Sequence, residues 1–212
     1  MLCDDCERFF NKYETMFTNK FFDSYIKTGK IKRRVTKQMW FFNYCLSVNW
    51  RVLYDDIYNE HSFEGDYPYD GFVDYEAQLS GYLNNLKNGL ECNTSQFENY
   101  VFKISELTQD GSIIKLFESL LYGYCIYNPT YYFYLTCTYY KGLLFVTEFI
   151  DKKVIYISTI KDIWSRKHRR RYLMREIFAE DIIEQARLAA QQYNENITNK
   201  LKMDIKNRYY SE

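Results

Sequence analysis

The residues best suited to chemistry lie at the start of the chain. Cys3 and Cys6 form a C-x-x-C pair, a spacing at which two thiolates can reach one tetrahedral zinc ion. The other candidate ligands are Cys45, Cys92, Cys125, Cys137, His61 and His168. They include no second close pair, although a structural zinc site takes about four ligands. Only two residues precede Cys3, whereas a thioredoxin-like motif follows a strand. Three interpretations stay open: no cofactor, structural zinc, or redox chemistry.

A basic cluster is the strongest local charge feature. Its five cations are Arg166, Lys167, Arg169, Arg170 and Arg171. Such a cluster could grip phosphates, and Trp164 and Tyr172 at its ends could stack on bases. The run from Lys30 to Arg34 would strengthen this hypothesis if the two groups meet in space. The alternative is a solvated helix face paired with the acids of 176–184.

Two segments carry a resemblance to a known set of proteins. Leu2-Cys3-x-x-Cys6-Glu7, with Phe10, Tyr13, Glu14 and Phe17 after it, resembles an LCxxCE element of uncharacterised bacterial proteins, and Leu46-Ser47-Val48-x-Trp50-Arg51 is similar to a second pattern of that set. The resemblance implies the second knuckle of a treble-clef or HNH-like zinc element. This sequence begins at that second pair, so the first knuckle is missing. An HNH nuclease also uses histidines as base and metal ligands; His61, in an acidic segment, is the better of the two candidates.

Composition limits the class of protein. The 212 residues are 47% hydrophobic and 20% aromatic, with 23 tyrosines, which excludes a disordered chain. The 28 basic and 28 acidic residues balance, so nucleic-acid binding would need a local patch. The N-terminus lacks the apolar stretch of a signal peptide, and the longest apolar region, 116–150, is interrupted by charges and a proline. The sequence therefore predicts a cytoplasmic protein with reduced thiols and no membrane span.

The hydrophobic pattern predicts an α+β fold, in which N-terminal helices pack with a three- to four-stranded antiparallel meander. Predicted helices are 4–27, 36–58 and 75–90, with a loop over 61–73 and a polar connection over 91–112. Predicted strands are 131–140, 143–150 and 154–158, with candidates at 120–127 and 100–104. Apolar residues surround most of helix 36–58, which predicts that it is central and buried. Thr136 and Thr138 alternate with apolar residues, which predicts a sheet with one packed and one wetter face.

An apolar stripe predicts one long C-terminal helix over 172–206. The chain then divides into a single α+β domain, 1–172, and a C-terminal amphipathic helix, 173–212, packed on that domain or on a partner. The candidate interaction residues are Phe178, Ile182, Ala186, Tyr193 and Ile197. A helix of this length exceeds what a compact domain needs, so it either wraps the core or reaches another chain.

Two functional hypotheses follow, because the chain carries none of the common catalytic or nucleotide-binding motifs. The first is a non-enzymatic intracellular interaction module or accessory subunit, with a bacterial or phage defence system as a candidate setting. It would bind a protein partner or form a homo-oligomer. The alternative is a nucleic-acid-binding protein or degraded nuclease of HNH or treble-clef descent. A weaker third hypothesis is an effector toxin whose site is assembled from distant residues.

Overall fold

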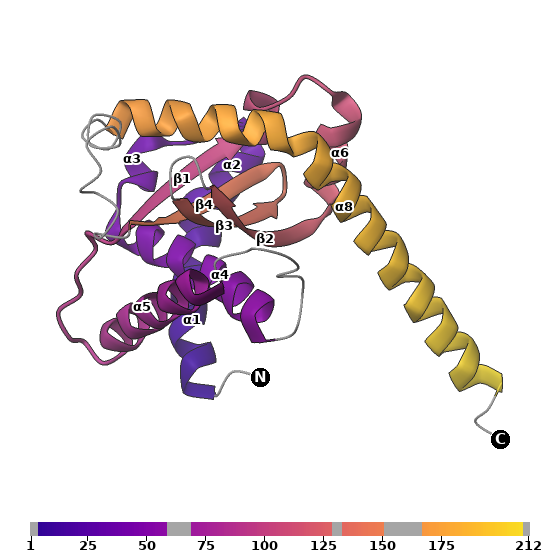
Figure 1. Cartoon of the computed structure of the whole chain (residues 1–212), viewed down its shortest axis with the longest axis horizontal. Helices are drawn as coiled ribbons and strands as arrows, with labels where there is room; N and C mark the ends of the chain where they lie inside the picture. Colours follow the sequence, from indigo (N-terminus) through magenta and orange to yellow (C-terminus); the bar gives the residue numbers. More distant parts are fainter. Residues whose placement is uncertain (1–3, 59–68, 129–132, 151–166, 210–212) are drawn as a thin grey trace.

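A four-stranded antiparallel sheet lies between two layers of helices (Figure 1). The computed structural model describes residues 4–58, 69–128, 133–150 and 167–209. The predicted α+β class, with its meander and long C-terminal helix, is confirmed.

The sheet has the strand order β1-β4-β3-β2. Its strands are β1 (Phe97–Lys103), β2 (Leu121–Asn128), β3 (Phe133–Tyr140) and β4 (Leu143–Phe149). β3 and β4 correspond to two strands of the predicted meander and β2 to its candidate strand 120–127, and β1 pairs with the outer edge of β4. Lys141 and Gly142 both have positive φ, 52° and 75°, which suits a tight turn between β3 and β4. The predicted strand 154–158 lies outside the described residues.

The first helical layer is the N-terminal one. It contains α1 (Asp4–Phe17), a π-helical turn (Thr18–Phe22), α2 (Asp23–Thr28), α3 (Arg33–Thr36), α4 (Met39–Tyr58) and α5 (Tyr69–Lys87). The predicted central helix is confirmed, since α4 packs against α1 and α5 as well as against the sheet. The loop prediction is wrong for 69–73, which begin α5. Position 71 of this helix needs a glycine, because a Cβ there would collide with the Tyr134 ring on β3.

The prediction of a wetter sheet face is also wrong. Thr136, Thr138 and Thr147 are buried on the face of the sheet that α4 and α5 cover. Asn49 of α4 satisfies two of them: its Nδ2 donates to Thr147 Oγ1 at 2.7 Å, and Thr138 Oγ1 donates to its Oδ1 at 2.7 Å. Thr147 in turn donates to Asn99 Oδ1 at 2.7 Å. Threonine therefore faces a second protein layer here, and these hydroxyls are paired internally instead of with water.

The second helical layer contains α6 (Gly111–Ser119) and α8 (Lys167–Tyr209). Helix α6 is absent from the sequence prediction, in which Asp110-Gly111 belongs to a polar connection. Asp110 instead caps α6, accepting from the backbone N–H groups of Ser112 and Ile113. Helix α8 crosses the sheet and then extends away from the body of the protein (Figure 1). Within the described ranges, no helix has the length and hydrophobicity needed to cross a bilayer.

Replacing Asn49 by Ala tests the contact between α4 and the sheet. The change removes an acceptor from Thr138 and a donor from Thr147 in a dry layer, so we expect a loss of about 2–3 kcal/mol in the free energy of unfolding. Urea denaturation measures it. Asn85→Ala, on the exposed side of α5, is the matched control and should change stability by less than about 0.5 kcal/mol. Equal effects of the two substitutions would contradict this role for Asn49.

Candidate functional site

The contact between α8 and the sheet contains a buried acid, Glu148 of β4. Its side chain has no solvent exposure. Tyr100 of β1 donates its hydroxyl to Glu148 Oε2 at 2.8 Å, and Arg170 Nη2 of α8 lies 3.9 Å from Oε1. Burial raises the pKa of Glu148 to about 7, although the charge of Arg170 and the Tyr100 hydrogen bond act in the opposite direction.

A carboxyl group with a pKa near 7 has the right strength for general acid–base catalysis. The lack of solvent access to Glu148 argues against a catalytic role for it in this arrangement. Glu148 is fully buried and Arg170 is 8% exposed, so a substrate could reach the acid only if α8 left the sheet. The arrangement is suited instead to holding α8 in one position, because an unpaired charge left in this layer would cost several kcal/mol.

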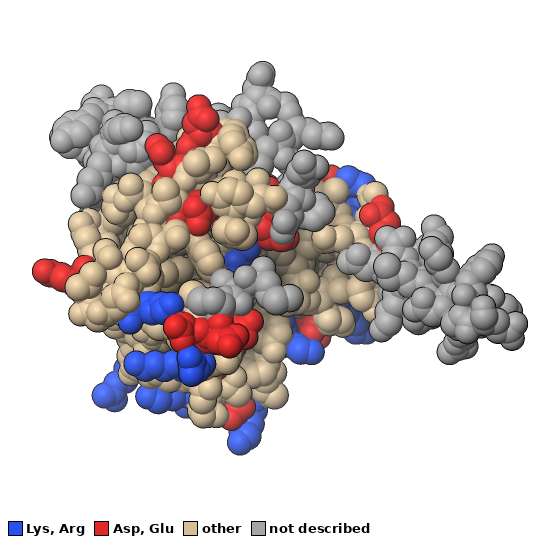
Figure 2. All heavy atoms as spheres, turned by 90° about the horizontal axis from the view of Figure 1, so that it is seen from below, with Lys and Arg blue, Asp and Glu red and all other residues tan. Residues whose placement is uncertain are grey.

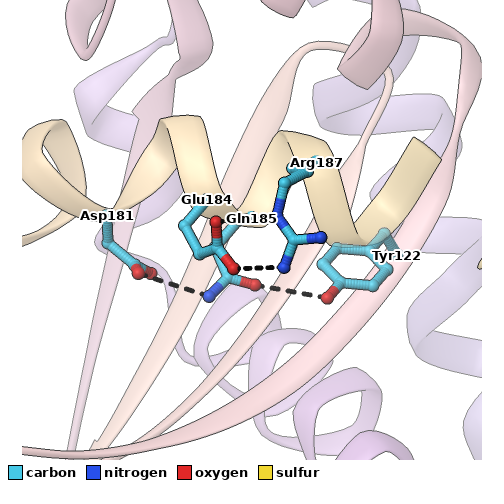
Figure 3. Close-up of polar contacts among 5 residues, drawn as sticks. All are labelled: Tyr122, Asp181, Glu184, Gln185 and Arg187. Carbon is cyan, nitrogen blue, oxygen red and sulfur yellow. Dashed lines mark hydrogen bonds and ion pairs between the residues drawn. The ribbon is translucent and has the colours of Figure 1, made fainter. Parts of the chain in front are cut away.

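A second polar group joins α8 to β2, and Figure 3 shows the part of it around Gln185. Gln185 donates to Asp181 Oδ1 at 3.3 Å and accepts from the Tyr122 hydroxyl at 3.2 Å. The Tyr124 hydroxyl donates to Asp181 Oδ2 at 3.1 Å and lies 3.2 Å from the Tyr139 hydroxyl. Burial raises the pKa of Asp181, against the hydrogen bonds that it accepts. These contacts fix the rotation of α8 about its axis, because they engage one side of the helix.

The predicted nucleic-acid-binding cluster is divided by the structure. Arg166 lies outside the described residues, as do the side chains of Lys167 and Arg169, which belong to α8. Arg170 points into the core toward Glu148. Arg171 Nη2 donates to Val101 O at 2.8 Å and its guanidinium covers the Phe102 ring at 4.5 Å, but its side chain stays 47% exposed. Arg170 thus has a structural role in the core. Arg171 also contacts the core, but part of its side chain is on the surface.

The predicted metal ligands are only partly described. Cys3 lies outside the described residues, and Cys6 accepts a hydrogen bond from Lys87 Nζ at 3.4 Å. The described part of the chain contains no cluster of three or more His, Cys, Asp or Glu side chains placed to hold a metal. Burial raises the pKa of Cys45, Cys125 and Cys137, so these three thiols are neutral and unsuited to nucleophilic attack.

The predicted interaction residues fall into two groups. Phe178, Ile182 and Ala186 are buried against the sheet of this same chain. Tyr193 is 49% exposed. Ile197 belongs to α8, but its side chain lies outside the described residues. The first part of the stripe therefore packs in cis, and burial along α8 ends at Ala189 among the described side chains.

The two segments that carry the sequence resemblance contact each other. Phe10 of α1 lies 5.8 Å from the Trp50 ring of α4, measured between centroids. Arg51 donates to Glu14 Oε1 at 2.6 Å and covers the Phe10 ring at 4.8 Å. The shared residues thus have a packing role between α1 and α4.

Sequence reasoning did not single out Glu148, Tyr100 or Asn49. One signal for Glu148 was present, since it is the only charged residue in the strand Leu143–Phe149. A lone acid in an apolar strand indicates a buried partner, but the partner lies in α8, which only the fold brings close. Asn49 likewise sits in an apolar helix and needed the facing threonines to explain it.

The stability of the protein should depend on pH through Glu148. The folded protein keeps this proton up to about pH 7, whereas an unfolded glutamate, whose usual pKa is 4.5, loses it earlier. Stability should therefore fall as the pH rises from about 4.5 to about 7, by roughly 3 kcal/mol in total. Urea denaturation at pH 5, 6, 7 and 8 measures this fall, to which Asp181 adds in the same direction.

Glu148→Gln should flatten the pH dependence, because the amide stays neutral throughout. Glu184→Gln is the control: this acid is exposed on α8 and its pKa is lowered, mainly by its hydrogen bond with Arg187 (Figure 3). It should leave the fall between pH 5 and 7 in place. A Glu148→Gln protein with the full wild-type dependence would refute the assignment.

Comparison with known proteins gave no match to a protein-family model, to a curated protein or to a solved structure. The resemblance to HNH-like proteins stays a prediction.

Proposed function

We propose that this protein is a non-enzymatic interaction module, and that the part of α8 beyond Ala189 binds a partner protein. The observation that carries the proposal is the division of α8 into an anchored part and a projecting part. Met174, Phe178 and Ile182 are at most 1% exposed. Helix α8 then continues to Tyr209 and leaves the body of the protein (Figure 1).

The anchored part holds the projecting part in a defined direction. Each fully buried apolar side chain stabilises the docked helix by about 1.5–3 kcal/mol. Arg170 with Glu148 and Gln185 with Tyr122 add polar contacts that specify one position on the sheet. The projecting part, 190–209, is about 30 Å long. In proteins most of the stability of a helix comes from tertiary packing of its apolar face, so a partner surface would stabilise this part.

The chemistry of the projecting part indicates the kind of partner. In sequence, Tyr193, Ile197, Leu201 and Ile205 recur at four-residue steps, which places them along one side of a helix. The four cations Lys200, Lys202, Lys206 and Arg208 exceed the two acids Glu195 and Asp204. A basic amphipathic helix of this kind fits an apolar groove with an acidic rim. Glu148 and Asp181, two acids whose pKa is raised by burial, both contact side chains of α8. Their role in positioning this helix supports a binding function for the protein.

Ile197→Asp with Leu201→Asp should abolish this binding. The two charges would replace two apolar side chains that a partner groove buries, which corresponds to a loss of affinity of roughly a hundredfold or more. The tagged full chain is expressed in its own host, and proteins retained by the wild type are compared with those retained by the variant. Asn199→Asp with Lys206→Gln changes the net charge by the same amount on the other side of the helix and should keep the partner.

Light scattering and hydrogen exchange separate the remaining outcomes. A wild-type mass of two chains, reduced to one by the stripe substitutions, identifies the partner as a second copy. In a dilute monomer the amides beyond 195 should exchange much faster than those of 174–189. A monomer that protects both parts equally would overturn the proposal, because the whole helix would then pack in cis.

A further inference from the structure

Two basic segments that are far apart in sequence meet at one end of the molecule. The first is the connection from α2 to α4, whose exposed cations are Lys30, Lys32, Arg33, Arg34 and Lys37. The second is the start of α8, with Arg171 and Arg175. Figure 1 shows α3 beside this end of α8. We refer to these seven residues as the basic end.

Strand β1 holds the two segments together. Ile31 and Val35, which lie among the cations of the first segment, pack against the apolar cluster that contains Val101. The carbonyl oxygen of Val101 accepts a hydrogen bond from Arg171 Nη2 at 2.8 Å. The first segment thus packs on an apolar cluster that includes Val101, and the second is hydrogen-bonded to the backbone of the same residue.

The charges of the two segments act on each other. Burial lowers the pKa of Arg171, Glu106 opposes this change, and the charges of Arg33 and Arg175 lower the pKa further. Arginine stays protonated in proteins despite such shifts. The folded protein therefore holds like charges close together, which costs free energy unless an anion is bound there.

The protein neutralises only part of this charge. Glu106 lies 3.8 Å from Arg171 and accepts from Arg175 through its backbone carbonyl at 3.2 Å. None of the five cations of the first segment forms an ion pair with a described acid. The chain as a whole is neutral, so its charges are unevenly distributed. Figure 2, which views the molecule from the side opposite the start of α8, shows Lys and Arg side chains toward one edge of that face with Asp and Glu side chains among them.

We propose that the basic end binds the phosphodiester backbone of a nucleic acid. A group of cations from separate elements suits a polymer that carries one charge per nucleotide on each strand. Aromatic residues adjoin both segments in sequence: Tyr172, which is 63% exposed, follows Arg171, and Trp40, whose ring lies 5.9 Å from Lys20 Nζ, comes three residues after Lys37. Aromatic rings of this kind can stack on the bases of a nucleic acid. An acidic protein or a lipid headgroup has no bases for such stacking.

Arg33→Gln with Arg34→Gln tests the proposal in the full chain. Fluorescence anisotropy with a labelled 20-nucleotide single strand and its duplex is recorded from 50 to 300 mM salt. The logarithm of the wild-type affinity should fall linearly with log salt, and the slope should decrease by about one for each phosphate that is no longer neutralised. We expect the variant to bind roughly tenfold or more weakly at about 0.1 M salt. Lys12→Gln with Lys115→Gln removes two exposed cations of α1 and α6 and should bind like the wild type.

Three results would overturn the proposal: no salt-dependent binding by the wild type, the same loss in both double variants, or binding to polyglutamate or anionic vesicles in place of nucleic acid. The last result would assign the surface to an acidic protein or a membrane. Thermal unfolding of both variants verifies that they are folded. Because these residues lie at the opposite end of α8 from 190–209, failure here leaves the proposed function standing.

Discussion

Helix α4 is apolar around most of its circumference, so it has to be enclosed, and the sheet, α1 and α5 together enclose it. Cys45, Leu46 and Leu53 have no solvent exposure as a result. This enclosure also buries the polar side chain of Asn49. It is stable there because the threonines of β3 and β4 lie opposite and share its hydrogen bonds. The meander and the N-terminal helices therefore depend on one dry contact in which both partners are satisfied.

Covering one face of the sheet with α4 leaves the other face to α6 and α8. That second contact is held by apolar burial and by polar side chains. Taking Glu148 and Arg170 out of water costs free energy, and their attraction returns only part of it, because burial keeps the carboxyl protonated up to about pH 7. What the pair supplies is specificity, since a shift of α8 along the sheet would separate the two groups. Helix α8 is thereby fixed at its start and in its middle, and its end is aimed away from the body.

The two proposed binding surfaces are consequences of this geometry. The start of α8 completes the basic end, and the distal part of the same helix forms the projecting part. A protein built this way would hold a nucleic acid at one end of a rigid helix and a protein partner at the other. Its buried acids then have the structural task of keeping that helix in place, which agrees with a module that binds without catalysis.

Local patterns in the sequence were sufficient for the fold class, the central helix, the meander and the long C-terminal helix, because the spacing of apolar residues and turn residues reports directly on backbone conformation. Local patterns failed for α6, because Asp110-Gly111 is a common turn sequence and Asp110 instead caps the helix that follows. They also could not show that threonine faces protein, that Arg170 points inward, or that Arg33 lies near Arg171. Those facts concern contacts between separate elements and the burial of one layer by another. Such contacts are decided only when the chain folds, since no local property of a residue states which distant group will lie against it.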